Sequence, residues 1–208
     1  VYCVLSPIIR NVTINPFKII CPADIGPVNN TNNQCGASVA TPNPTFVAPC
    51  AATTLTWVLS GATIANSSNT GLNYVGTRNF NVGETTVTYT ATNTYGVKTT
   101  CSYTVTVVDN QAPSISCPSN ISVNNTPGSC GAVVTYIAPV GTDNCSGVTT
   151  IQTAGLASGK TFPVGVTTNT FKVTDAAGNY TSCSFTVTVI DNQPPTISNC
   201  PADYAKNT

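Results

Sequence analysis

Hydrophobic and polar residues alternate along much of the chain with a period of two. The segment 184–190, SFTVTVI, places its Phe and two of its Val side chains on one face and its Ser and Thr side chains on the other. Successive side chains of a strand point to opposite faces, so this pattern predicts a half-buried β-strand. The segments 85–92 and 132–138 alternate less regularly but are rich in strand-forming residues. No segment shows a helical stripe.

Turn residues divide these segments at short, regular intervals. Gly, Pro or Asn recurs roughly every 8–12 residues between the predicted strands, which is typical of sandwich folds. The pattern predicts an all-β chain built from antiparallel β-sandwiches of about seven strands each.

The chain also repeats itself. CSYTVTVVDNQAPSISCP from Cys101 matches CSFTVTVIDNQPPTISNCP from Cys183, and the segments upstream of both correspond as well. These matches predict one sandwich over residues 15–110 and a second over residues 111–192. Residues 1–14 then correspond to the last strand of a preceding repeat, and residues 193–208 to the first strand of an incomplete third repeat.

Ten cysteines occur in the absence of any histidine. No two cysteines form a C-x-x-C pair, which argues against zinc and for disulfides in an oxidising, extracellular compartment. Each repeat has four cysteines in the same order, Cys21, Cys35, Cys50 and Cys101 in the first and Cys117, Cys130, Cys145 and Cys183 in the second. Four cysteines allow three pairings. In an up-and-down sandwich the first and third would start strands that run the same way, so we expect the pairs Cys21–Cys50, Cys35–Cys101, Cys117–Cys145 and Cys130–Cys183.

Charge is scarce. Only 7% of the 208 residues are charged, with seven Lys and Arg balancing seven Asp and Glu. There is no basic field to attract nucleic acid or an anionic membrane, and no apolar run reaches the roughly 18 residues of a membrane helix. We therefore expect neither nucleic acid nor membrane insertion among its partners.

The order of short motifs in the second repeat resembles that of the hyalin repeat (HYR) family. These motifs are CP, CG before a strand, DNCS (143–146), FPVG (162–165), TDAAGN (174–179) and CSFTVTV (183–189). The first repeat departs from them, with APCA (48–51) in place of DNCS and TNTYGV (92–97) in place of TDAAGN. The resemblance covers residues 14–203. It implies immunoglobulin-like extracellular modules with a structural or adhesive role, usually in a larger array, and no catalytic activity.

Two cysteines lie outside the two repeats. Cys3 occupies the position of a fourth cysteine, 18 residues before Cys21, and Cys200 occupies the position of a first cysteine, 17 residues after Cys183. An unpaired strand such as VYCVLSPII (1–9) leaves backbone groups unsatisfied and recruits another chain. One hypothesis is therefore head-to-tail assembly of copies, with strand exchange by residues 1–12 and Cys3 and Cys200 bonded between subunits. The alternative is that the chain is a window of a longer protein in which both cysteines pair outside the window.

Several residues are candidates for binding or modification. Asp109 and Asp191 stand at repeat boundaries, where a calcium ion could bind, although six to eight oxygens are needed and capping of turns is the favoured role. We expect no cofactor. Trp57 aligns with Ile151, and burial in the core is favoured over stacking on a sugar.

Carbohydrate could be attached to the chain. Sequons for N-glycosylation occur at Asn11, Asn29, Asn66, Asn120, Asn124, Asn144 and Asn179. Asn144, beside Cys145, is the least suited, and in a source without this machinery all seven would be bare.

Catalysis finds little support. The chain has no His to act as a base, and its acids are scattered singly, so we expect no enzyme. The sequence favours a structural subunit of an extracellular filament, self-assembled by strand exchange. The alternative is a spacer or ligand-binding segment of a large multi-repeat adhesin.

Overall fold

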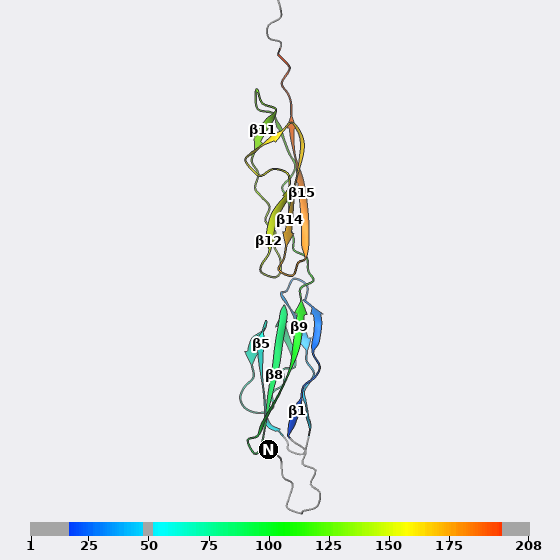
Figure 1. Ribbon diagram of the computed structural model, residues 1–208, viewed down its shortest axis with the longest axis vertical. Helices are drawn as coiled ribbons and strands as arrows, with labels where there is room; N and C mark the ends of the chain where they lie inside the picture. Colours follow the sequence, from blue (N-terminus) through cyan, green and yellow to red (C-terminus); the bar gives the residue numbers. More distant parts are fainter. Residues whose placement is uncertain (1–16, 48–51, 197–208) are drawn as a thin grey trace, which may run out of the picture. The chain divides into compact units, whose positions relative to one another are not determined.

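The computed structural model describes residues 17–47 and 52–196, and all regular elements within these ranges are β-strands (Figure 1). The chain divides into two compact units after Gln111, one residue beyond the boundary expected from the repeats. Unit 1 also includes the short segment Asn144–Ser146, which comes from the second repeat. The expectation of an all-β fold with two immunoglobulin-like sandwiches is confirmed.

Unit 1 contains nine strands in its described residues. They are β1 (Lys18–Ile20), β2 (Ile25–Asn29), β3 (Gly36–Ala40), β4 (Thr45–Val47), β5 (Ala52–Gly61), β6 (Ala65–Asn66), β7 (Thr77–Asn81), β8 (Gly83–Asn93) and β9 (Lys98–Val108). The largest sheet has the order β2-β9-β8-β5-β6, and the pairs β3-β7 and β1-β4 form two smaller sheets. The short strand β6 has no counterpart in the main sheet of unit 2, which ends at β12 (Thr149–Ala154) in the described residues.

Unit 2 repeats this plan with six strands in its described residues. They are β10 (Ile121–Asn124), β11 (Gly131–Val134), β12 (Thr149–Ala154), β13 (Lys160–Pro163), β14 (Gly165–Thr174) and β15 (Tyr180–Ile190). The order β10-β15-β14-β12 forms the main sheet, and β11 pairs with β13. The long hairpin β14-β15 corresponds to β8-β9 of unit 1.

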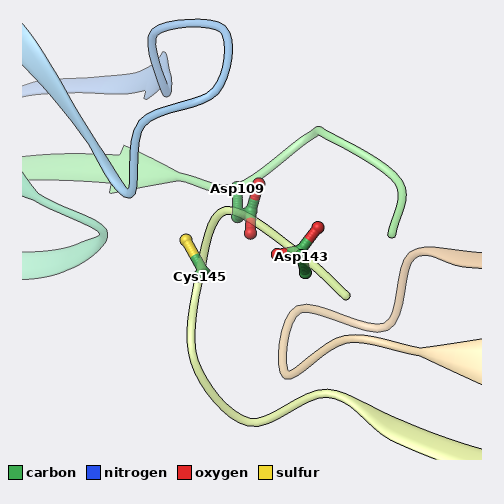
Figure 2. Close-up of side chains that lie close together, drawn as sticks. All are labelled: Asp109, Asp143 and Cys145. Carbon is green, nitrogen blue, oxygen red and sulfur yellow. The ribbon is translucent and has the colours of Figure 1, made fainter. Parts of the chain in front are cut away.

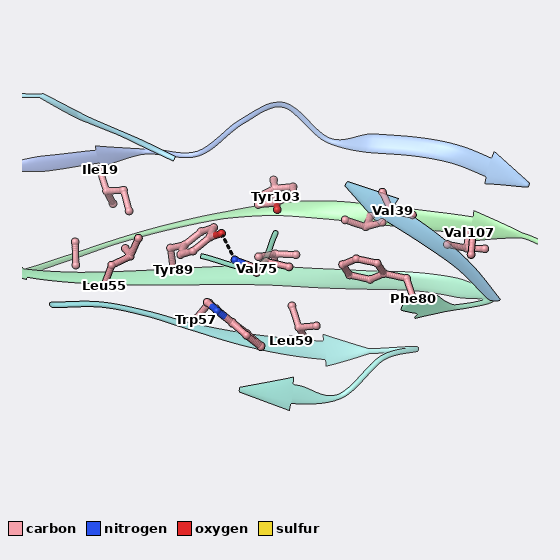
Figure 3. Close-up of a cluster of buried hydrophobic side chains, with 14 of the residues drawn as sticks. Ile19, Val39, Leu55, Trp57, Leu59, Val75, Phe80, Tyr89, Tyr103 and Val107 are labelled. Carbon is pink, nitrogen blue, oxygen red and sulfur yellow. Dashed lines mark hydrogen bonds between the residues drawn. The ribbon is translucent and has the colours of Figure 1, made fainter. Parts of the chain in front are cut away.

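The period-two pattern decides which side chains form the two cores. In β8, Val87, Tyr89 and Ala91 are fully buried, and they alternate with partly exposed threonines. Phe80 from β7 and Val39 from β3 bury their side chains in the same cluster (Figure 3). Burial of apolar surface, at about 25 cal/mol per Å², is the main force holding the sheets together.

The only tryptophan is a core residue, as expected. Trp57 is 6% exposed, and the guanidinium of Arg78 lies 4.7 Å from the centroid of its ring. The expected equivalence with Ile151 is wrong, because Ile151 is 57% exposed. Trp57 pairs with Tyr89 in register, as Gln152 pairs with Phe171, so the true counterpart is one residue further along.

The first strand of each main sheet runs parallel to the last strand. Ile25 pairs with Val105 in unit 1, and Ile121 pairs with Val187 in unit 2. A cysteine lies four residues before each of these four paired residues. The parallel register therefore brings the first and fourth cysteines of each unit to the same level, and disulfides join Cys21 to Cys101 and Cys117 to Cys183.

These bonds correct the expected pairing. Of the predicted pairs, Cys35–Cys101 and Cys117–Cys145 are wrong, because Cys101 and Cys117 have other partners. Cys21–Cys50 and Cys130–Cys183 are wrong for the same reason, while Cys50 itself lies outside the described residues. The prediction assumed that all strands alternate in direction, whereas the first strand joins the sheet parallel to the last.

Loss of the first-to-fourth disulfide should destabilise unit 2 strongly. Cys183→Ser opens a loop that spans 66 residues and should lower the free energy of unfolding by about 2–5 kcal/mol. Denaturant unfolding followed by circular dichroism checks this. Cys117→Ser should have the same effect, and the double variant should lose no more than either single one. Cys130→Ser is the matched control, expected within about 0.5 kcal/mol of the parent; a larger loss there would support the pairing rejected above.

Unit 1 should lose stability at alkaline pH. Burial raises the pKa of Tyr89 above its ordinary value of about 10, and its hydroxyl accepts a hydrogen bond of 3.0 Å from the Val75 amide (Figure 3). Because the pKa of Tyr89 is higher in the folded state, neutral Tyr89 contributes to the free energy of unfolding. That contribution is complete below pH 10 and is lost as the pH rises through the folded pKa.

Unfolding midpoints from Trp57 fluorescence between pH 8 and 11 measure this loss. Tyr89→Phe should weaken the dependence on pH above 10 while lowering stability at pH 8, because the Val75 amide loses its acceptor. The exposed Tyr95→Phe variant is the control and should follow the parent. An unchanged alkaline slope in Tyr89→Phe contradicts the assignment.

Candidate functional site in the DNQ clamp and cysteine turn

Each unit has a tight turn that ends in Cys-Gly and leads into the smaller sheet. We call residues 31–36 and 126–131 the cysteine turns. In unit 1 the Thr31 amide donates to the Gly36 carbonyl at 2.8 Å, and in unit 2 the Thr126 amide donates to the Gly131 carbonyl at the same distance. A left-handed residue stands at the third position of each turn, Asn33 with φ 61° and Gly128 with φ 74°. Asn and Gly are the residues that adopt this conformation most readily.

A buried asparagine holds each cysteine turn to the end of the last strand. Asn30 donates from Nδ2 to the Gln34 carbonyl at 3.0 Å, and its Oδ1 accepts from the Asn110 amide at 3.2 Å. In unit 2, Asn125 makes the equivalent bonds to Ser129 at 3.0 Å and from Asn192 at 3.3 Å. The same contacts thus recur in both units.

The DNQ motif after each last strand completes the arrangement, which we call the DNQ clamp (109–111 and 191–193). The Asp109 carboxylate accepts from the Gln111 amide at 3.1 Å, and Gln111 Oε1 accepts from the Asn33 amide at 2.7 Å. Asp191 accepts from Gln193 at 3.0 Å, and Gln193 accepts from Gly128 at 2.9 Å. The clamp therefore caps the end of the sandwich from which the chain leaves each unit.

The aspartates at the repeat boundaries act in these turns. Asp109 Oδ1 also accepts a hydrogen bond of 3.0 Å from Asn30 Nδ2, in addition to the bond from Gln111. Asp109 and Cys145, both in unit 1, bring possible ligand atoms within 4.8 Å (Figure 2). The Cys145 sulfur is bonded to Cys35 and is not a thiolate, so it is no metal ligand. Asp109 then offers two carboxylate oxygens, whereas calcium takes six to eight oxygens. Asp143, also drawn in Figure 2, belongs to unit 2.

The cysteine turn of unit 1 bears a disulfide that the sequence did not predict. Cys35 is bonded to Cys145, which lies in the segment Asn144–Ser146 of unit 1. Asn144 Nδ2 donates to the Gln34 carbonyl at 3.1 Å, which holds this segment on the turn. The second cysteine of one repeat is thus joined to the third cysteine of the next repeat. In unit 2, the equivalent Cys130 is a free and exposed thiol.

The sequons differ in how their asparagines are placed. Four of them have exposed side chains, Asn29, Asn66, Asn120 and Asn124. Asn144 and Asn179 are partly buried and donate from Nδ2, Asn179 to the Asp175 carboxylate at 2.9 Å. Asn66 also donates from Nδ2, to the Ser67 carbonyl at 3.0 Å, so the attachment atom is already engaged in these three. Asn11 lies outside the described residues, as do Cys3, Cys200 and residues 1–14.

Sequence reasoning missed the DNQ clamp and the bond between Cys35 and Cys145. The DNQ motif served only to reveal the repeat, although its recurrence beside two turns of equal length, TNNQCG and TPGSCG, was a usable signal. The sequence of a single repeat could not predict the bond between Cys35 and Cys145, because it joins the second cysteine of one repeat to the third cysteine of the next.

The fold, the clamp and the disulfides together define an extracellular, disulfide-braced β-sandwich module, since such bonds persist in oxidising compartments. The sequence model of the HYR domain matches residues 51–107 and 108–189. The chain belongs to the HYR domain family. No helix in the described residues is long and apolar enough to span a bilayer.

Several curated proteins are similar to the chain. Hyalin of Strongylocentrotus purpuratus is 41% identical over 58% of the chain, and hyalin of Lytechinus variegatus is 34% identical over 70% of it. The matched regions make up 10% and 28% of those two proteins, so the chain spans a minor part of their length. Among solved structures, extracellular cadherin domains 3–6 of protocadherin gamma B2 align over 85% of this chain and 52% of that one, with 10% identity and a TM-score of 0.36.

Removal of the asparagine that ties the cysteine turn to the DNQ clamp should destabilise unit 2. Asn125→Ala leaves the Ser129 carbonyl and the Asn192 amide without their partner and should cost about 1–3 kcal/mol of unfolding free energy. Asn124→Ala, at the exposed neighbouring position, is the matched control and should change it by less than about 0.5 kcal/mol. Denaturant unfolding of unglycosylated protein measures both. Equal effects of the two variants would mean that the hydrogen bonds of Asn125 contribute nothing to the free energy of unfolding.

Proposed function

We propose that the chain is a structural, non-catalytic subunit of an extracellular filament in which disulfide-braced HYR modules join head to tail by strand exchange. The observation that supports this best is the first-to-fourth pairing of cysteines in both units. By position, Cys3 is a fourth cysteine and Cys200 a first cysteine. Under the same rule these two are partners, and we propose that they bond between successive copies.

The composition of the chain suits such an assembly. The first nine residues, VYCVLSPII, carry no charge and are largely apolar, as is typical of a strand that is buried on both faces. We propose that residues 1–12 add to a neighbouring copy as a strand, with backbone hydrogen bonds between the two copies. With 7% charged residues, packed copies repel one another little. A head-to-tail contact that does not close on itself grows a fibre.

A second candidate function is supported by the length of the relatives. The two hyalins match this chain over only 10% and 28% of their own length. Segments similar to this chain therefore also occur within proteins that are several times longer. In that case the chain would be a spacer or adhesive segment of a multi-repeat protein, at the cell surface or secreted.

Electron microscopy of purified protein tests the proposal. The full chain should form filaments, whereas deletion of residues 1–12 should leave monomers, because the exchanged strand is missing. Cys3→Ser in a Cys130→Ser background is the matched control, since it retains the strand, loses only the proposed bond to Cys200, and has no exposed Cys130 thiol to form another link. It should form filaments that denaturing detergent disperses without reductant.

Intact mass and non-reducing peptide mapping of native material separate the two functions. A native mass near 21.4 kDa and a peptide pair joining Cys3 to Cys200 support the filament. A native chain well above that mass supports the multi-repeat protein. A full-length chain that stays monomeric at high concentration rules out assembly by strand exchange.

A further inference from the structure

Cys130 stands in the same local structure as Cys35, which is bonded. The Val164 amide donates to the Cys130 carbonyl at 3.1 Å, as the Val82 amide does to the Cys35 carbonyl at 3.3 Å. The next residue in each turn is a glycine packed against the opposite strand. A Cβ atom on Gly36 or Gly131 would lie 2.5 Å from the carbonyl oxygen of Phe80 or Phe162, respectively. The two cysteines are therefore held by the same backbone.

The acceptor that holds the bonded segment in unit 1 also has a counterpart in unit 2. The Gln34 carbonyl accepts from Asn30 at 3.0 Å and from Asn144 at 3.1 Å, and so uses both of its lone pairs. The equivalent Ser129 carbonyl accepts from Asn125 at 3.0 Å, and it stands beside the exposed thiol of Cys130. A carbonyl oxygen and a thiol are thus presented together, as they are where Asn144 and Cys145 bind in unit 1.

We propose that Cys130 is a docking thiol, which forms a disulfide with the third cysteine of a further HYR module. The Asn that precedes that cysteine, where the module has one, would donate to the Ser129 carbonyl. This inference rests on the proposed function and names the contact that one module makes with the next. The third cysteine could come from two sources: Cys50 of a second copy of this chain, which follows Pro49 and brings no such Asn, or a module further along the same polypeptide. The chemistry at Cys130 is the same for both.

The bond forms by thiol–disulfide exchange with a disulfide oxidant such as oxidised glutathione. The Cys130 thiolate attacks one sulfur of the oxidant and releases one reduced thiol. The thiolate of the incoming cysteine then attacks the mixed disulfide at the Cys130 sulfur and releases the second. In sum, two protein thiols lose two protons and two electrons, and one oxidant disulfide becomes two thiols. An exposed cysteine in an oxidising compartment is expected to find such a partner.

The test is incubation of the full chain in a glutathione redox buffer, followed by non-reducing electrophoresis and peptide mapping. We expect covalent oligomers, a peptide pair that joins Cys130 to Cys50, and loss of maleimide labelling at Cys130. Cys130→Ser should abolish that pair and leave the Cys35–Cys145 bond in place. The double variant Ser129→Cys with Cys130→Ser is the matched control. It retains one thiol in the same turn but moves it by one residue, so a specific docking thiol predicts no rescue.

The outcomes also separate this inference from the proposed function. Cys130–Cys50 bonds without filaments would support the docking thiol and contradict strand exchange. Filaments whose Cys130 still labels fully with maleimide would contradict the docking thiol and leave strand exchange intact. In native material, a bond from Cys130 to a cysteine absent from this sequence, in a module of the same longer polypeptide, supports the docking thiol with the second source. If the moved thiol of the shifted-thiol variant bonded to Cys50 as often as Cys130 does in the parent, the bond would be random oxidation and the inference would be overturned.

Discussion

The parallel pairing between the first and last strands of the main sheet is the constraint on which each module depends. The register is fixed by the pairs Ile25–Val105 and Ile121–Val187. Each of these residues follows a cysteine by four positions, so the two cysteines of a pair also lie opposite each other. The last strand is thereby paired on both sides, with β8 or β14 on one side and the first strand on the other. It also ends at the DNQ motif, so the register decides where the clamp meets the cysteine turn. A shift of one residue would turn every side chain of the first strand to the opposite face.

Much of the fold could be predicted because period-two alternation is a local property. The burial of Phe185, Val187 and Val189 follows directly from SFTVTVI, and each is at most 2% exposed. Because the sequence repeats, the strands predicted for one unit applied to the other unit as well. The segment 132–138 was harder, since β11 ends at Val134 and Ile137 is 89% exposed. Apolar residues outside a strand cannot be assigned to a face by alternation.

Pairings between distant strands could not be predicted in the same way. Whether β2 runs parallel or antiparallel to β9 depends on how the 68 residues between them (30–97) fold, and no short segment encodes it. The disulfide prediction failed at this step. The roles of Asp109 and Asp191 in turns agree with the favoured expectation from sequence, because an Asx residue bonding to an amide two positions on is a local contact. The family resemblance was more dependable than any pairing rule, since it rested on an ordered set of motifs.

The disulfide between first and fourth cysteines also governs how a module responds to tension. A pull on the two ends of unit 1 passes through the bond between Cys21 and Cys101, so the residues between them bear no load. Without that bond, those 79 residues (22–100) would extend to roughly 260–280 Å once the sandwich opened. With the bond intact, the contour length of a stretched module is limited to its short flanks. Such a module resists lengthening even after its sheets have come apart, and a reductant would allow residues 22–100 to extend.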